Sequence, residues 1–118
     1  MVRIYHNARC SKSRATLALL EQRGEAVEII NYLDQPPSAP ELVVLLRQLG
    51  MSPRELIRTG EADYLELGLD DPALDDAALI AAMVEHPKLI ERPIVVANGR
   101  AAIGRPPEAV LAILETRP

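Results

Sequence analysis

Residues 2–30 read VRIYHNARCSKSRATLALLEQRGEAVEII, and this stretch decides the fold of the chain. Its first residues, 2–5, form a short apolar run typical of a strand. Residues 11–23 then place leucines at helical spacing and end before Gly24. A second strand-like run follows at residues 26–30. Because a helix that crosses between neighbouring strands makes them parallel, the stretch predicts a right-handed βαβ unit.

The middle of the chain carries helix signals instead of strand signals. Ser38 begins a capping box, Ser-x-x-Glu, after a loop rich in prolines. Residues 52–55 read SPRE and repeat this device, with proline at the first helical position. Asp75 or Asp76 can cap a third helix, which we expect to end near His86 because a proline follows. These residues therefore predict a helical insertion.

The last third of the chain predicts a hairpin and a final helix. Residues 93–97 and 100–103 are strand-like, and the Asn98-Gly99 pair between them is typical of a type I′ turn. Residues 104–108 then open a helix with prolines in its first turn. The apolar positions expected to lie against the sheet are Val110, Leu111 and Leu114. The order βαβ, helical insertion, ββα is the thioredoxin-like arrangement, an α/β fold with a four-stranded mixed sheet.

Composition favours a single soluble domain. The chain has 118 residues, of which 48% are hydrophobic, and a formal net charge of −4. This size suits one domain spanning residues 1–118, and the apolar content excludes a disordered chain. An acidic balance without a Lys/Arg tract argues against nucleic acid as a partner. The longest apolar run, residues 77–84, is shorter than the ~20 residues of a membrane span, and no signal region follows Met1, so we expect a cytoplasmic protein without a membrane partner.

Cys10 is the one cysteine of the chain, so no internal disulfide can form and a redox role needs an outside thiol. No Cys/His cluster predicts a metal, and no glycine-rich phosphate loop predicts a nucleotide, so we expect no bound cofactor. Cys10 falls where the first loop meets the first helix, whose positive end favours the nucleophilic thiolate. Arg9, Lys12 and Arg14 add cationic neighbours. The alternative is an inert buried cysteine.

Two polar residues near Cys10 have two interpretations each. Ser13 stands three residues after it, where a Cys-X-X-Cys protein has its resolving thiol. Its hydroxyl either donates a hydrogen bond to the thiolate or caps the helix. His6 either favours the thiolate electrostatically or is a loop histidine satisfied by the backbone.

Three arginines fall at breaks in the pattern, namely Arg58, Arg92 and Arg105. Guanidinium groups are planar bidentate donors suited to tetrahedral oxyanions, although each could equally be a scattered surface arginine. Pro93 directly precedes a strand, the place of the cis-proline beside the catalytic thiol in thioredoxin-like folds. Since only about 5% of X–Pro bonds are cis, the sequence alone favours a trans bond there.

Four segments together resemble the glutaredoxin-coupled arsenate reductase family. They are IYHNARCSKSR at 4–14, RELIR at 54–58, HPKLIERPIVV at 86–96 and GRP at 104–106. The resemblance implies a thioredoxin-like fold in which Cys10 attacks arsenate. It further implies that Arg58, Arg92 and Arg105 hold the oxyanion, that His6 and Ser13 favour the thiolate, and that Pro93 is cis.

The resemblance also implies the partners and the chemistry of arsenic detoxification. Glutathione, as co-substrate, attacks the adduct of Cys10 with arsenate, glutaredoxin removes that glutathione as a mixed disulfide, and arsenite leaves Cys10. One departure is Ala8, where the family usually has proline after His-Asn, which removes a fixed φ from the loop.

Two other functions share this fold. One is a glutathione-linked thiol oxidoreductase without arsenate activity, which would form mixed disulfides but not turn over arsenate. The other is an RNA-polymerase-binding redox regulator. Such regulators typically use a Cys-X-X-Cys pair, and Ser13 denies this chain an intramolecular switch.

Overall fold

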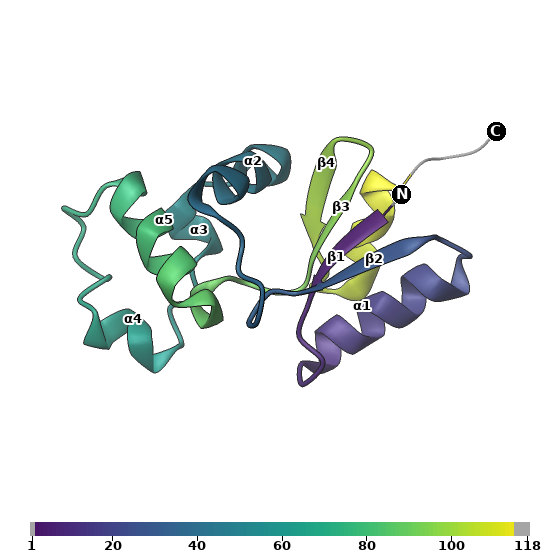
Figure 1. Ribbon diagram of the computed structural model, residues 1–118, viewed down its shortest axis with the longest axis horizontal. Helices are drawn as coiled ribbons and strands as arrows, with labels where there is room; N and C mark the ends of the chain where they lie inside the picture. Colours follow the sequence, from purple (N-terminus) through teal and green to yellow (C-terminus); the bar gives the residue numbers. More distant parts are fainter. Residues whose placement is uncertain (1, 115–118) are drawn as a thin grey trace. The chain divides into compact units, whose positions relative to one another are not determined.

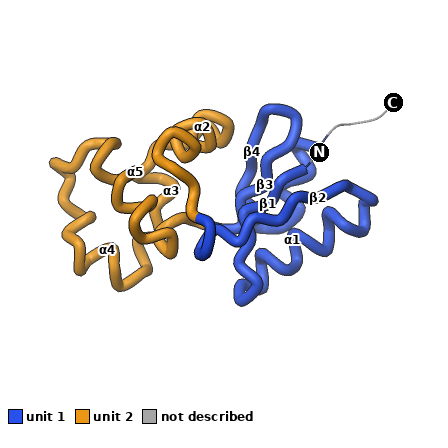
Figure 2. The backbone as a smooth tube through the Cα atoms, viewed as in Figure 1, with its two compact units in different colours: residues 1–35, 92–118 blue, residues 36–91 orange. Residues whose placement is uncertain are grey.

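The computed structural model describes residues 2–114, and the chain divides into two compact units (Figure 2). Unit 1 comprises residues 1–35 and 92–118, and unit 2 comprises residues 36–91. Along the chain, unit 2 is therefore an insertion between two halves of unit 1, as the pattern of helix signals predicted. That residues 1–118 act as one domain stays a prediction.

Unit 1 contains the four-stranded mixed sheet, in the order β2-β1-β3-β4 (Figure 1). Its elements are β1 (Val2–His6), α1 (Ser11–Gln22), β2 (Val27–Asn31), β3 (Ile94–Ala97), β4 (Arg100–Ile103) and the 3₁₀ helix η2 (Pro107–Ile113). β1 pairs parallel with β2, while β3 is antiparallel to both β1 and β4. The predicted α/β fold class and mixed sheet are confirmed.

The core of unit 1 lies between the sheet and its helices. Val2 and Ile4 alternate with exposed Arg3 along β1, so both point to one face. There they join one buried cluster with Leu20 of α1 and Val110 of η2. Burying a side chain such as Leu20 contributes about 1.5–3 kcal/mol, so this cluster holds α1 against β1.

The β3–β4 hairpin follows from its turn. Asn98 and Gly99 have φ values of 55° and 74°, as a type I′ turn requires at both central positions. The Asn98 side-chain amide also donates to the carbonyl oxygen of Ile113 at 3.0 Å, which ties the turn to the end of η2.

The last helical segment differs from the prediction. It is a seven-residue 3₁₀ helix, in which Val110, Ile113 and Leu114 are buried but Leu111 is 38% exposed. Side chains three residues apart eclipse one another in a 3₁₀ helix. Val110 and Ile113 therefore share the inner face, and Leu111 turns away from it.

Unit 2 is helical. Its elements are α2 (Ala39–Leu49), α3 (Pro53–Leu56), α4 (Ala62–Glu66), α5 (Asp76–Glu85) and the 3₁₀ helix η1 (Pro87–Leu89). The Ser52 side chain accepts from the Glu55 N–H, and the Glu55 carboxylate accepts from the Ser52 N–H, so the predicted capping box is confirmed. Ser38 and Asp75 also cap their helices as predicted. The sequence patterns did not predict α4, which spans five residues.

Candidate active site

Cys10 occupies the N-cap of α1, in the loop that follows β1. Its backbone is extended, its N–H donates to the Asn7 carbonyl at 3.0 Å, and its carbonyl accepts from the Arg14 N–H at 3.0 Å. The residue is 8% exposed, and the first turn of α1 contains no acidic residue. The unpaired N–H groups and the dipole of a helix N-terminus favour an anion at this position.

Arg105 brings a cation to the sulfur from the far end of the sequence. Its Nη2 lies 3.7 Å from Cys10 Sγ, and its Nε donates to the Arg92 carbonyl oxygen at 2.8 Å. The guanidinium therefore bridges the nucleophile loop and the segment that enters β3. A cation at this distance stabilises a thiolate, and guanidinium N–H groups are suited to binding an oxyanion.

Arg92 and Pro93 lie directly before β3, in the segment that Arg105 contacts. The Arg92–Pro93 bond is cis, as the resemblance implied and contrary to what the sequence alone favoured. The Arg105–Pro106 bond is cis as well, which neither the sequence alone nor the family resemblance predicted. Arg105 meets Arg92 through the Arg92 backbone carbonyl oxygen, so the part of the Arg92 guanidinium in oxyanion binding stays a prediction.

His6 and Ser13 form a buried pair beneath the loop. His6 Nδ1 lies 2.6 Å from Ser13 Oγ, which also accepts from the Asn7 N–H at 3.0 Å. Burial, and then the positive charge of Arg14, lower the pKa of His6 below its ordinary value of 6.5. At neutral pH the imidazole is therefore mostly uncharged, and its side-chain contact is the one with Ser13 Oγ.

The position of the single imidazole proton decides what Ser13 can donate. If Nδ1 carries the proton, Ser13 Oγ accepts two N–H groups and keeps its own hydrogen for another acceptor. If Nε2 carries it, Ser13 donates to His6 instead. That His6 and Ser13 favour the thiolate of Cys10 stays a prediction. A hydrogen bond from Ser13 to the sulfur requires the tautomer with the proton on Nδ1.

Arg58 belongs to unit 2, where acidic side chains surround it. Its Nη1 bonds Glu61 Oε1 at 2.5 Å and its Nε lies 3.7 Å from Glu91 Oε1. Its backbone N–H donates to the Leu89 carbonyl at 2.7 Å, next to an isolated bridge that joins residues 57 and 90. The structure thus holds Arg58 firmly within unit 2, and its part in oxyanion binding stays a prediction.

Comparison with known proteins decides the family. A model described as the ArsC family matches residues 5–113. The chain belongs to the ArsC family. A Neisseria meningitidis relative named arsenate reductase is 54% identical over 114 residues, which are 96% of this chain and 97% of the relative. A Haemophilus influenzae relative of the same name is 49% identical over 112 residues, covering 94% and 97%.

Solved structures agree with this ArsC assignment. The structure titled arsenate reductase from Vibrio cholerae is 60% identical, with a TM-score of 0.94, and the match covers 96% of this chain and 97% of the other. This likeness confirms the resemblance to the arsenate reductases and the thioredoxin-like ArsC fold.

The ArsC fold brings residues to the site that sequence reasoning missed. Arg14 was noted only as a nearby cation, yet its Nη1 donates to the Ala8 carbonyl at 2.8 Å and closes the loop around Cys10. Gly104 was noted only as the first residue of the GRP segment, yet its N–H donates to the Pro93 carbonyl at 2.9 Å. A glycine at the end of a strand can mark a close approach of backbones, and that signal was available.

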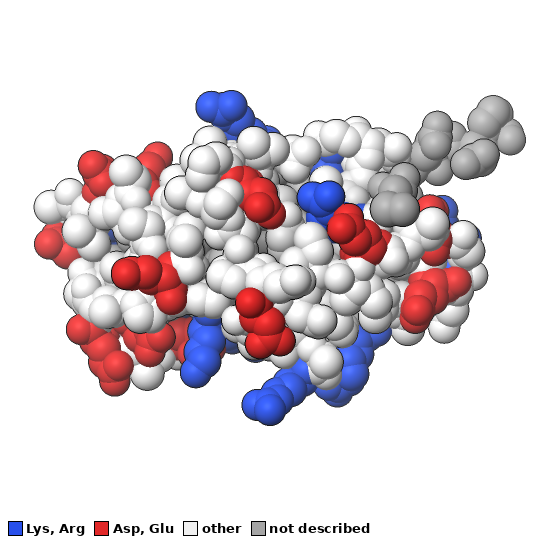
Figure 3. All heavy atoms as spheres, viewed as in Figure 1, with Lys and Arg blue, Asp and Glu red and all other residues white. Residues whose placement is uncertain are grey.

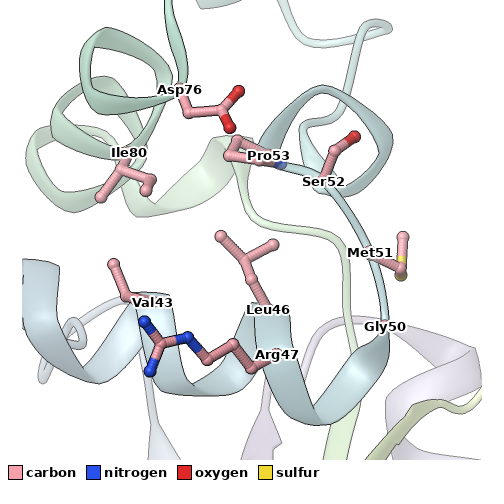
Figure 4. A pocket seen from close by; sticks show the side chains of 9 residues that line it. All are labelled: Val43, Leu46, Arg47, Gly50, Met51, Ser52, Pro53, Asp76 and Ile80. Atoms are coloured by element: carbon pink, nitrogen blue, oxygen red, sulfur yellow. The ribbon is translucent and has the colours of Figure 1, made fainter.

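The hollows in the part of the chain that the structure describes include the following two. One, of about 330 Å³, adjoins the nucleophile loop and is lined by residues 6–9 together with Asn31, Leu33 and Asp34. The other, of about 460 Å³, lies in unit 2, where Val43 and Leu46 of α2 face Ile80 of α5 (Figure 4). The hydroxyl in its lining, Ser52, is already used as a helix cap. The lining of this hollow contains no cysteine, histidine or lysine.

Residues 2–114 contain no group of three or more His, Cys, Asp or Glu side chains that could hold a metal ion. None of their helices is long and apolar enough to cross a membrane. On the face drawn in Figure 3, Asp, Glu, Lys and Arg side chains are scattered among uncharged atoms.

Proposed function

We propose that this chain reduces arsenate to arsenite, with Cys10 as the nucleophile and with glutathione and a glutaredoxin as the thiol partners. The observation that carries the proposal is the guanidinium of Arg105 at 3.7 Å from the sulfur of Cys10. The relatives named arsenate reductase support the choice of substrate, because each aligns with more than nine-tenths of this chain.

The proposed reaction begins at the Cys10 thiolate. Its sulfur attacks arsenic, and an S–As bond forms as one oxygen leaves as water after protonation. The arginines hold the remaining oxygens. The neighbouring cation and the helix N-terminus favour the anionic sulfur before the attack.

Two outside thiols supply the two electrons. Glutathione replaces a second oxygen on arsenic, which again leaves as water. A glutaredoxin thiolate then attacks the glutathione sulfur and forms a mixed disulfide, while the electron pair of the As–S bond stays on arsenic and reduces it from As(V) to As(III). Hydrolysis of the remaining bond to Cys10 releases arsenite and the thiol. The single cysteine supports such a scheme, since the chain holds no second thiol to form a disulfide.

Three arginine variants test the oxyanion site. We expect Arg58→Ala, Arg92→Ala and Arg105→Ala each to raise the KM for arsenate about tenfold or more, because a hydrogen bond to a charged group contributes about 1.5–3 kcal/mol. Arg100→Ala, which removes an exposed arginine of β4, is the matched control and leaves KM unchanged. Unchanged KM values in all three variants, with normal melting, would refute the oxyanion site.

If the wild-type protein does not turn over arsenate but forms a mixed disulfide with glutathione at Cys10, it is instead a glutathione-linked thiol oxidoreductase. A cytoplasmic location stays a prediction.

A further inference from the structure

Gly104 lies where three parts of unit 1 meet. It follows β4 directly, and its N–H donates to the Pro93 carbonyl oxygen at 2.9 Å. Its φ lies outside the left-handed region, so its backbone conformation does not require glycine. Any need for glycine at this position must therefore come from space.

The space around Gly104 is closed on two sides. An added Cβ would lie 2.3 Å from Thr16 Oγ1, 3.0 Å from Thr16 Cγ2 and 2.8 Å from Pro93 Cγ. At each of the other five glycines an added Cβ meets nothing within 4 Å. The close approach is thus particular to this position.

Neither neighbour can yield easily. Thr16 is fully buried, and its hydroxyl donates to the Lys12 carbonyl at 2.8 Å, with a second, longer contact to the Gly104 carbonyl at 3.5 Å. A β-branched side chain within a helix has few χ1 alternatives. The ring of Pro93 is also buried. A methyl group at position 104 must therefore displace the backbone around it.

That backbone leads directly to Arg105. Thr16 lies on α1, the helix that begins at Cys10, whereas Gly104 immediately precedes the arginine whose guanidinium reaches the sulfur. The contact between Gly104 and Thr16 consequently sets how closely the Arg105 segment approaches the helix that carries Cys10.

We propose that Gly104 is a positioning residue: the absence of its side chain lets the Arg105 segment pack against Thr16 and Pro93 closely enough to hold the guanidinium on Cys10. This inference rests on the proposed role of Cys10 as the nucleophile. It assigns to Gly104 no contact with the substrate.

The test is the rate at which iodoacetamide alkylates Cys10 at pH 6 and low salt, a readout that needs no arsenate. We expect Gly104→Ala to slow alkylation about two- to threefold, as Arg105→Ala does, because both remove the same cation from the thiolate. In the Arg105→Ala background, Gly104→Ala should change nothing further, since two changes that act through one contact are not additive. Gly60→Ala, where the added Cβ meets nothing, is the control and keeps the wild-type rate.

Rescue provides the second arm. Thr16→Ala removes both Oγ1 and Cγ2, so Cys10 should be alkylated faster in Gly104→Ala/Thr16→Ala than in Gly104→Ala. The rate in this double variant should still be lower than in Thr16→Ala alone, because Pro93 Cγ still obstructs the methyl group. If Gly104→Ala does not fold, this last comparison decides the question.

Two results overturn the proposal. One is a folded Gly104→Ala protein in which Cys10 is alkylated at the wild-type rate. If Gly104→Ala does not fold, the corresponding result is a Gly104→Ala/Thr16→Ala protein that is alkylated as fast as Thr16→Ala. The other is a loss of rate that is equally large in the Arg105→Ala background. Failure of arsenate turnover with these alkylation results intact would count against the proposed function and leave the positioning role standing.

Discussion

Replacing Arg105 by alanine removes the guanidinium that contacts the sulfur of Cys10. Arg105 Nη2 lies 3.7 Å from Sγ, and two opposite unit charges at this distance attract each other by about 1 kcal/mol in bulk water and about 4.5 kcal/mol at an effective dielectric constant of 20. Because Arg105 is exposed, solvent screening favours the lower figure. A loss of about 1 kcal/mol corresponds to about a fivefold change in the equilibrium that forms the anionic sulfur.

The alkylation rate falls less than the thiolate fraction does. A thiolate that is less stabilised is also a stronger nucleophile, with a Brønsted slope of about 0.4–0.5, which recovers about half of the logarithmic loss. We therefore expect iodoacetamide to react with Cys10 about two- to threefold more slowly in Arg105→Ala at pH 6 and low ionic strength. Added salt should narrow the difference, since it screens the pair.

Two variants sharpen this measurement. Arg105→Lys keeps the charge and should retain most of the wild-type rate, while Arg100→Ala removes an exposed cation of β4 and should not alter it. An Arg105→Ala protein that alkylates as fast as the wild type at low salt would refute the reasoning, because the contact would then contribute nothing to the anionic sulfur.

Three further predictions concern stability, measured by urea unfolding. Burial lowers the pKa of His6 in the folded chain, so the unfolded chain takes up the proton first as the pH falls below about 6.5. The free energy of unfolding should therefore drop between pH 7 and pH 5. An equal drop in a His6→Asn chain would contradict this prediction. Ser52→Ala removes the accepting half of a capping box and should cost about 1 kcal/mol; no measurable loss would mean that the box does not stabilise α3. Leu20→Ala opens a cavity in the core of unit 1 and should cost about 2–5 kcal/mol, whereas Leu65→Ala, at a 67% exposed position, should stay within about 0.5 kcal/mol; similar losses in both would contradict the assigned core.

Local signals predicted the parts of this fold that local chemistry controls. The hydroxyl of Ser52 accepts the orphan N–H of Glu55, so the four residues 52–55 suffice to mark the start of the helix. Asn98 and Gly99 both adopt positive φ, which few other pairs tolerate, and the hairpin follows from that preference. The mixed sheet could then be inferred from the order of the elements.

Contacts between distant parts of the chain could not be predicted in this way. Arg105 and Cys10 are 95 positions apart, and only the completed sheet brings them together. The lowered pKa of His6 depends on how deeply the ring is buried, which spacing does not reveal. Leu111 was expected against the sheet because helical spacing was assumed, whereas the segment is a 3₁₀ helix with another period.

The most direct test of the proposed function is arsenate-dependent oxidation of NADPH in the presence of glutathione, glutaredoxin and glutathione reductase, compared between the wild type and Cys10→Ser. The proposal predicts turnover in the wild type and none in the variant. A wild-type chain without arsenate-dependent turnover, or a Cys10→Ser chain that retains it, would contradict the assignment of Cys10 as the nucleophile of an arsenate reductase.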